Sequence, residues 1–340
     1  QIENLGIQTI TDLSYAVPNL SVWDRGPGVQ TITIRGIGNI RGSSSLVGLY
    51  LDESPVSVLP YAQLDLQAID LARVEVLRGP QGTLYGQGSV GGTVRFITND
   101  PSFDGVSGQI GSSIYQTSKG GWSKEVTGIA NIPVVDNVMA FRVAASYKNK
   151  DGWIDQPATG KTDINDNELS NVRLKGLWQA SENLIANLTA IRHRSEAGND
   201  NVVNIDPVDD SLYQSSVDPA LTNNIIDDYD LYNLTFNYDL SFATLTSATS
   251  HLELEKFQRA PSQRAFFAGV STVFELLNRD LGEKAEVFTQ EVRLSSDSDV
   301  SPFGWTVGMF YSDLEHRVDQ LAFDVATGGT LLFSLPPKLE

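Results

Sequence analysis

Hydrophobic and polar residues alternate along much of the chain after residue 105. Within residues 231–240, for example, Tyr232, Leu234, Phe236 and Tyr238 are separated by polar residues. A period of two is typical of a β-strand with one apolar face. The pattern predicts nine strands, over residues 106–117, 122–133, 138–149, 168–180, 184–195, 229–239, 242–258, 286–296 and 303–316. Most of these reach or exceed the ~9–11 residues of a tilted strand that crosses a membrane.

The connections between the predicted strands alternate in length. After a first loop at 118–121, the short connections are 134–137, 181–183, 240–241 and 297–302, and the long ones are 150–167, 196–228, 259–285 and 317 onward. Outer-membrane barrels have short periplasmic turns and long extracellular loops, whereas a soluble sandwich has no reason to sort its loops by length. The alternation therefore favours a membrane barrel, with residues 1–105 on its periplasmic side. The aromatic girdles of that barrel would include Tyr115, Trp122, Tyr147, Trp153, Trp178, Trp305 and Tyr311.

Nine strands would form only part of such a barrel. Single-chain bacterial barrels have an even number of strands, and an open sheet would leave unpaired edges in lipid. We therefore expect further strands beyond Glu340 and interpret the chain as an internal fragment of a longer protein.

Residues 1–105 have a different composition from the rest of the chain. They hold 14 of the 29 glycines, 10 acidic residues, 6 arginines and no lysine. Their pattern predicts a short helix over Asp12–Val17, capped by Thr11 or Asp12 and ended by Pro18. It also predicts helical turns over Leu64–Ala68 and strands over Thr31–Arg35, Leu46–Leu51, Ala72–Leu77 and Thr93–Thr98. This composition indicates a small α+β domain with a mixed sheet, followed by the strand-rich domain 106–340.

Charge and composition exclude several kinds of function. The net charge of −18 argues against a general nucleic-acid binder, because neutralising phosphates requires clustered Lys and Arg. The absence of cysteine excludes disulfides, thiolate metal sites and cysteine nucleophiles. His193, His251 and His316 lack the spacing of metal ligands, so we assign no metal and no cofactor. No nucleophile, base and acid form a recognisable set, and the sequence does not support an enzyme.

A glycine motif at residues 86–91 resembles a nucleotide-binding fingerprint. Gly86, Gly88 and Gly91 match G-x-G-x-x-G, which requires a helix immediately after it. The residues that follow, 92–98, are β-branched and predict a strand. A strand at this position argues against a dinucleotide-dependent oxidoreductase. The glycines are better explained by turns and close backbone approach.

The segment RGPQGTLYG at 78–86, continued by GGTVRFIT at 91–98, closely resembles the plug-domain signature of TonB-dependent outer-membrane receptors. The signature residues are Arg78, Gly79, Pro80, Gly82, Tyr85, Gly86, Gly91 and Gly92. TIRGIG at 33–38 and GLYLD at 48–52 are similar to earlier plug elements, and residues 288–296 and 305–311 are similar to a recurring pair of barrel strands. The resemblance implies a 22-stranded barrel filled by an amino-terminal plug. In this family a signal peptide and a TonB box precede the plug, and neither is found in the sequence that begins at Gln1, which fits an internal fragment.

The resemblance also implies a function. TonB-dependent receptors take up scarce, bulky ligands with force from the inner-membrane TonB–ExbB–ExbD complex, and a ferric siderophore is the default ligand. A glycan, cobalamin or an aromatic compound would suit the same architecture, and a soluble β-rich binding or adhesion protein is the alternative from another class. Lipid and lipopolysaccharide would surround the barrel. The acidic loop 196–228 binds divalent ions that bridge lipopolysaccharide, repels anionic competitors or, as the simplest interpretation, is an ordinary solvated loop.

Two sets of site residues follow from the resemblance. Arg35 and Arg78 of the plug are expected to face Glu291 of the barrel wall, either as a latch that breaks during transport or as a static ion pair. The plug would be a unit of low stability held mainly by polar contacts. The predicted ligand contacts at the plug tips are Tyr61, Gln63, Tyr85 and Gln87.

Overall fold

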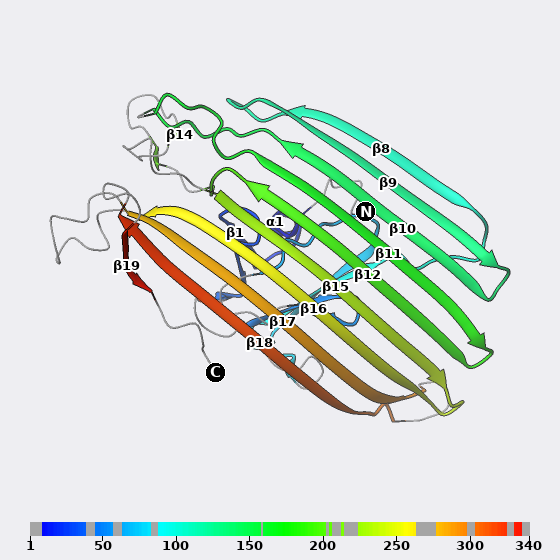
Figure 1. Cartoon of the computed structure of the whole chain (residues 1–340). Helices are drawn as coiled ribbons and strands as arrows, with labels where there is room; N and C mark the ends of the chain where they lie inside the picture. The colour runs from blue at the N-terminus through cyan, green and yellow to red at the C-terminus, as the bar shows by residue number, and fades with distance from the viewer. Residues whose placement is uncertain are drawn as a thin grey trace.

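The computed structural model describes residues 9–38, 45–56, 63–82, 88–157, 159–201, 204–205, 212–213, 224–262, 277–297, 303–324 and 330–334. Figure 1 shows a broad sheet of long strands, with the amino-terminal elements behind it in this view. Among the described residues, no helix has the length and apolar character needed to cross a membrane.

The large sheet is antiparallel, and its ten described strands lie in the order β19-β18-β17-β16-β15-β12-β11-β10-β9-β8. Their bounds are β8 (Ser107–Gln116), β9 (Trp122–Val135), β10 (Met139–Lys150), β11 (Asn167–Ser181), β12 (Leu184–Ala197), β15 (Asn224–Asp239), β16 (Ala243–Ser262), β17 (Leu277–Ser296), β18 (Thr306–Asp324) and β19 (Thr330–Ser334). All nine predicted strands are present. β15, β16, β17 and β18 extend beyond their predicted limits, and β19 was not predicted.

The amino-terminal residues form a smaller α+β unit. Helix α1 (Ile10–Ala16) is followed by a three-stranded sheet of β1 (Leu20–Asp24), β2 (Gln30–Ile34) and β3 (Ile37–Gly38). A second sheet has the order β5-β4-β7-β6, with bounds β4 (Val47–Leu51), β5 (Ser54–Pro55), β6 (Leu71–Arg78) and β7 (Gly92–Thr98). β4 and β7 are parallel and the other pairs are antiparallel, so the predicted mixed sheet is confirmed.

Two local predictions in this unit were wrong. The helix begins at Ile10 rather than Asp12, because Thr9 and Asp12 form a capping box, with each side chain bonded to the other's backbone nitrogen. No helix forms over Leu64–Ala68. That segment packs against the large sheet, where the Asp65 amide donates to Asp227 Oδ2 at 3.3 Å. Within the segment, the Leu66 amide donates to the Leu64 carbonyl at 2.9 Å, which is a tight turn and not a helical bond.

Short and long connections lie mostly at opposite ends of the large sheet, as predicted. The exception follows β18, which continues to Asp324 and is separated from β19 by residues 325–329 alone, although a long connection was predicted from residue 317 onward. The turns 136–138, 182–183 and 240–242 are short, whereas 151–166, 198–223 and 263–276 are long. The longest of these, 198–223, includes the two-residue strands β13 (Asn204–Ile205) and β14 (Leu212–Tyr213). A feature near residues 150, 167 or 197 therefore lies at the long-loop end.

The outward face of the sheet carries an apolar belt. Its exposed large side chains include Tyr147, Val172, Leu174, Trp178, Leu188, Tyr232, Leu234, Phe236, Tyr238, Phe288 and Tyr311. Charged residues replace them on the same face toward the long-loop end, where Arg194, Asp228, Glu255 and Lys284 stand opposite one another on successive strands. A belt bounded by charge is the pattern of a barrel wall in lipid.

The inward face is layered, and its middle layers are apolar. One cross-strand row consists of Ile191, Leu231, Leu252 and Val287, and the next of His193, Tyr229, Leu254 and Ala285. The apolar members of both rows join one buried core with the amino-terminal unit, including Ile32, Leu49, Val94 and Phe96. The interface is therefore less polar than predicted, since strands covered on both faces need no polar side.

Candidate functional site: the interface between the amino-terminal unit and the large sheet

Asp70, at the start of β6, anchors the amino-terminal unit to β10 and β11. Arg142 donates from Nε and Nη2 to the two carboxylate oxygens of Asp70, at 2.7 and 2.6 Å. Arg173 Nη2 donates to the carbonyl oxygens of Ile69 and Asp70, at 2.7 and 3.0 Å. The Asp70 side chain is only 2% exposed. A buried, bidentate pair of this kind fixes both position and orientation.

A second anchor is Lys175 of β11. Its ammonium donates to Asp100 Oδ1 at 2.6 Å, Thr98 Oγ1 at 2.8 Å and Asp52 Oδ2 at 3.3 Å. Asp52 also accepts from the Thr98 amide and hydroxyl, at 2.8 and 2.7 Å. All three donors of Lys175 are therefore used by the end of β7 and the turn after β4.

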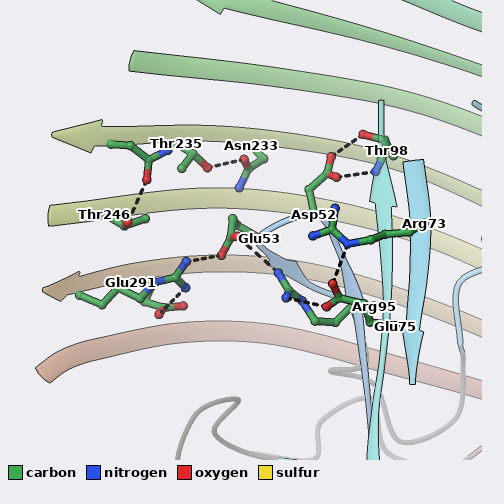
Figure 2. Close-up of polar contacts among 12 residues, drawn as sticks. Asp52, Glu53, Arg73, Glu75, Arg95, Thr98, Asn233, Thr235, Thr246 and Glu291 are labelled. Carbon is green, nitrogen blue, oxygen red and sulfur yellow. Dashed lines mark hydrogen bonds and ion pairs between the residues drawn. The ribbon is translucent and has the colours of Figure 1, made fainter. Parts of the chain in front are cut away.

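A third contact joins Glu53 to β17 (Figure 2). Arg293 Nη2 lies 3.0 Å from Glu53 Oε2, and its Nη1 lies 3.1 Å from Glu291 Oε1. On its other side, Glu53 Oε1 lies 3.4 Å from Arg95 Nη2. The chain of charges continues from Arg95 to Glu75 and on to Arg73. The hydrogen bond from Arg73 lowers the pKa of the Glu75 carboxyl, so this acid stays ionised.

The structure places the predicted latch residues differently from the expectation. Glu291 pairs with Arg293 of its own strand, and within the described residues neither Arg35 nor Arg78 forms an ion pair. Arg35 lies in the turn between β2 and β3, and its Nη1 is 3.7 Å from the point where a Cβ on Gly79 would stand. Near Glu291, the ion pair that joins the amino-terminal unit to the large sheet has its charges reversed relative to the prediction. The arginine, Arg293, belongs to the sheet, and the carboxylate, Glu53, belongs to the amino-terminal unit.

The sequence pattern did not identify Asp70, Lys175 and Glu53 as anchors, although the distribution of charge along the chain indicated that such contacts form. The amino-terminal unit has 10 acidic residues and no lysine. The strands that face it carry Arg142, Arg173 and Lys175 in alternation with apolar outward residues. Inward bases opposite an acidic unit indicate complementary charge, but not which acid meets which base.

The signature glycines allow close packing of backbones. Gly92 has φ +148°, and a Cβ on it would lie 2.4 Å from the Leu77 carbonyl oxygen. A Cβ on Gly91 would lie 3.0 Å from Ile37 Cγ2. The Gly79 amide donates to the Gly91 carbonyl at 3.1 Å and joins the two halves of the motif. Pro80 and Gly82 follow directly on the same strand end, whereas Tyr85 and Gly86 lie outside the described residues.

Among the predicted ligand contacts, Gln63 alone falls within the described residues. Its side chain is buried, and its backbone N–H donates to the Gly28 carbonyl at 3.4 Å. Tyr61, Tyr85 and Gln87 lie outside the described residues.

We predict that Glu53 and Arg293 stabilise the docked unit only modestly. Their side chains are 27% and 31% exposed, so a double-mutant cycle with Glu53→Gln and Arg293→Met should give a coupling of about 0.5–1 kcal/mol. The measurement is the free energy of local opening of β6 and β7 by hydrogen exchange in the full-length protein. Glu255→Gln breaks an ion pair on the outward face and should leave that opening unchanged. A coupling of zero would show that the two groups act independently.

The amino-terminal unit and the strands that follow it are similar to known proteins. Residues 1–93 match the model of the TonB-dependent Receptor Plug Domain. The chain is 28% identical over 183 residues to a pesticin receptor of Yersinia pestis, a match that covers 52% of this chain and 25% of that protein. It is 29% identical over 187 residues to a hemin receptor of Yersinia enterocolitica, covering 52% and 26%.

Solved structures share the fold. The ferric yersiniabactin uptake receptor FyuA from Yersinia pestis superposes with a TM-score of 0.84 at 19% identity, covering 98% of this chain and 49% of that one. The siderophore receptor PiuA from Acinetobacter baumannii gives a TM-score of 0.72 at 17% identity, covering 98% and 47%.

The chain spans about half the length of these solved receptors. Its amino-terminal unit corresponds to a plug and its large sheet to part of a barrel wall. The matched family consists of transport receptors rather than enzymes. Residues 1–93 therefore match the plug domain of TonB-dependent receptors, and the chain as a whole shares the fold of a plug with part of a β-barrel wall.

Proposed function

We propose that the parent protein is an energised uptake receptor whose cargo is a ferric siderophore complex. The observation that carries this proposal is the anchoring of the plug on the inward face of the wall, at Asp70, Lys175 and Glu53. A plug held there obstructs the lumen, so a bulky cargo needs the plug to move.

The nature of the anchors supports a requirement for energy. Separating a buried ion pair so that one charge is left without its partner costs about 3–5 kcal/mol. The apolar rows that also contact the plug increase the free energy needed to move it. The outer membrane has no ATP to supply such work. We propose that the TonB–ExbB–ExbD complex supplies it by pulling on the amino-terminal side of the plug.

Several relatives support iron-containing cargo. They include a ferric yersiniabactin uptake receptor, a ferric citrate transporter, a ferripyoverdine receptor and a hemin receptor. A glycan, cobalamin or an aromatic compound would be handled by the same plug and is kept as an outcome of the uptake experiment.

We further propose that the plug ends and the barrel begins at residues 105/106. Asn131 of β9 ties down this junction, because its side chain accepts from the Ser102 amide at 2.8 Å and donates to the Ser102 and Gly105 carbonyls at 2.9 Å. Lipid and lipopolysaccharide would contact the outward belt and the charged residues beyond it. Gln63, Tyr61, Tyr85 and Gln87 remain our proposed ligand contacts, and Arg35 and Arg78 our proposed partners of the wall during plug movement.

The experiment is uptake by cells that produce the full-length receptor. A panel of radiolabelled ferric siderophores, cobalamin and oligosaccharides is offered to cells with and without the TonB complex. We expect accumulation of one ferric complex, abolished without TonB. Uptake of a different ligand would change the cargo, and uptake indifferent to TonB would overturn the proposal.

A further inference from the structure

A cavity of about 190 Å³ lies between the plug and the inner wall at the long-loop end. The plug contributes Asp24, Gln30, Asp65 and Gln67, and the wall contributes residues at the ends of β8–β12 and in the loop 151–166. None of these residues takes part in the three anchors described above. The cavity is therefore a separate feature of the interface.

Two glutamines leave hydrogen-bond acceptors unused there. Gln30 and Gln67 are 9% and 7% exposed, and both line the cavity. Among the described residues, the Oε1 atom of each is buried and has no hydrogen-bond partner. A buried carbonyl oxygen without a donor is costly, so these two oxygens indicate a ligand that carries hydrogen-bond donors.

The charge of the cavity points to a cation. Its described lining holds three carboxylates, Asp24, Asp65 and Asp151, and a single base, Lys150. Burial raises the pKa of both Asp24 and Asp65, although the Gly26 amide donates to Asp24 Oδ1 at 2.9 Å. Neither Asp24 nor Asp65 lies within 4.0 Å of a lysine or arginine nitrogen in the described ion pairs.

Aromatic rings complete the lining. Tyr115 and Trp153 were predicted in the outer girdle, but both line this cavity instead. Tyr115 stands opposite Ser123 on the inward face of β8, and Trp153 lies just after β10, where its amide donates to Asn165 Oδ1 at 2.8 Å. An ammonium group is attracted to the face of such rings.

We propose that this cavity binds a small organic ammonium ion, held by the carboxylates of Asp24 and Asp65 and the amide oxygens of Gln30 and Gln67. An ammonium group has three donors and one charge, which matches this set of acceptors. A metal ion fits less well, because no group of three His, Cys, Asp or Glu in the described part of the chain is placed to hold one. The ammonium belongs either to a free amine or to an amine-bearing arm of the cargo, and the second case rests on the proposed uptake function.

The competing occupant is the ammonium of Lys150. It lies close enough to Asp24 and Asp65 to lower the pKa of both, in opposition to burial. If Lys150 satisfies the carboxylates, an added amine would find no site.

The test is calorimetric titration of the full-length receptor in detergent with 1,4-diaminobutane. We expect saturable binding of one diamine, no binding of the neutral isostere 1,4-butanediol, and no competition by CaCl₂. Asp65→Asn should weaken binding by about tenfold or more, because a charge-assisted hydrogen bond becomes a neutral one. Gln67→Leu, which keeps the carboxylates, should also weaken it. Asp104→Asn, at an exposed position outside the cavity, should not.

Other outcomes would overturn the inference. They are no saturable binding to the wild-type receptor, equal binding of the diol, displacement of the diamine by calcium, or unchanged affinity in both Asp65→Asn and Gln67→Leu. Competition by the cargo found in the uptake experiment separates the two sources, since an amine-bearing cargo should displace the diamine and one without an amine should not. Because binding is measured without transport, a failure of the proposed uptake leaves this result readable.

The pH dependence gives a further readout. Asp65 is faced by Lys148 and Lys150 of β10, Lys256 of β16, His193 of β12 at 4.0 Å, and Asp24 and Asp227. Since burial raises the pKa of Asp24 and Asp65, these carboxylates gain protons at a higher pH than ordinary aspartates. Diamine affinity should therefore fall as the pH is lowered and should begin to fall above the usual aspartate range near 4. An affinity that rises on acidification would contradict the assignment.

Discussion

Asp70→Ala is expected to produce a large loss of plug anchorage. The carboxylate pairs with Arg142 through two hydrogen bonds and lies 3.6 Å from Arg173 Nη2, and all three side chains are largely buried. Removing it leaves the Arg142 guanidinium without its bidentate partner and the Arg173 guanidinium with backbone carbonyls alone, and the loss of one partner of a buried ion pair typically costs about 3–5 kcal/mol. The free energy of local opening of β6 and β7, measured by hydrogen exchange in the full-length receptor, should fall by that amount.

Two comparisons isolate the charge. Asp70 has φ +51°, a conformation that asparagine tolerates better than alanine, so Asp70→Asn removes the charge with little backbone strain. Asp104→Ala removes an exposed carboxylate of the same plug that bonds only locally to Ser102. We expect Asp70→Asn to lower the free energy of local opening by most of the amount lost in Asp70→Ala, and Asp104→Ala to leave it unchanged. If the free energy of local opening in Asp70→Asn equals that of the wild type, backbone geometry and not the charge of Asp70 anchors the start of β6 to β10 and β11.

Gly92→Ala is the second substitution with a large expected effect. Gly92 begins β7 at φ +148°, and an added Cβ would lie 2.4 Å from the Leu77 carbonyl oxygen and 3.0 Å from Ile34 Cδ1. The backbone oxygen belongs to the paired strand β6 and cannot move away without breaking the pair. We expect destabilisation of about 3 kcal/mol, combining roughly 1–2 kcal/mol of backbone strain with about 1–3 kcal/mol of overpacking.

Gly36→Ala separates these two contributions. Gly36 also has a positive φ, +79°, but no heavy atom lies within 4 Å of its Cβ position. It should therefore show the backbone strain alone, and the difference between the two variants in hydrogen exchange of β6 and β7 measures the steric conflict. Equal effects at both positions would refute the close packing of β6 on β7.

The two substitutions test different roles of the signature region. Gly92 determines whether the plug sheet can form, whereas Asp70 determines whether the formed sheet stays on the wall. Under the proposed uptake function, the first role must be strong and the second must be breakable by an applied force. Charged anchors suit this role, because a displaced carboxylate or guanidinium regains hydration in water whereas an exposed apolar core does not.

The sequence by itself determined the strand-rich architecture, the mixed sheet of the plug and the identity of the signature. Alternation in β10, β11 and β15 was sufficient because the outward belt is apolar and most inward positions there are polar. The prediction was too short for β15 and β17 because charged residues, Asp228 and Lys284, occupy outward positions beyond the belt. Where polar residues occupy both faces of a strand, hydrophobicity does not alternate with a period of two, and the sequence pattern does not reveal the strand.

Only the tertiary structure decided which charges meet. Asp70 and Arg142 are 72 residues apart, and Asp52 and Lys175 are 123 residues apart. The complementary charges of plug and wall are visible in the sequence, but their pairing depends on strand register and on where the plug rests. The segment around Asp65 shows the same limit, because its contacts with β15 take the place of the helical hydrogen bonds that its pattern predicted. Local preference is weak per residue, and docking against a preformed wall overrides it.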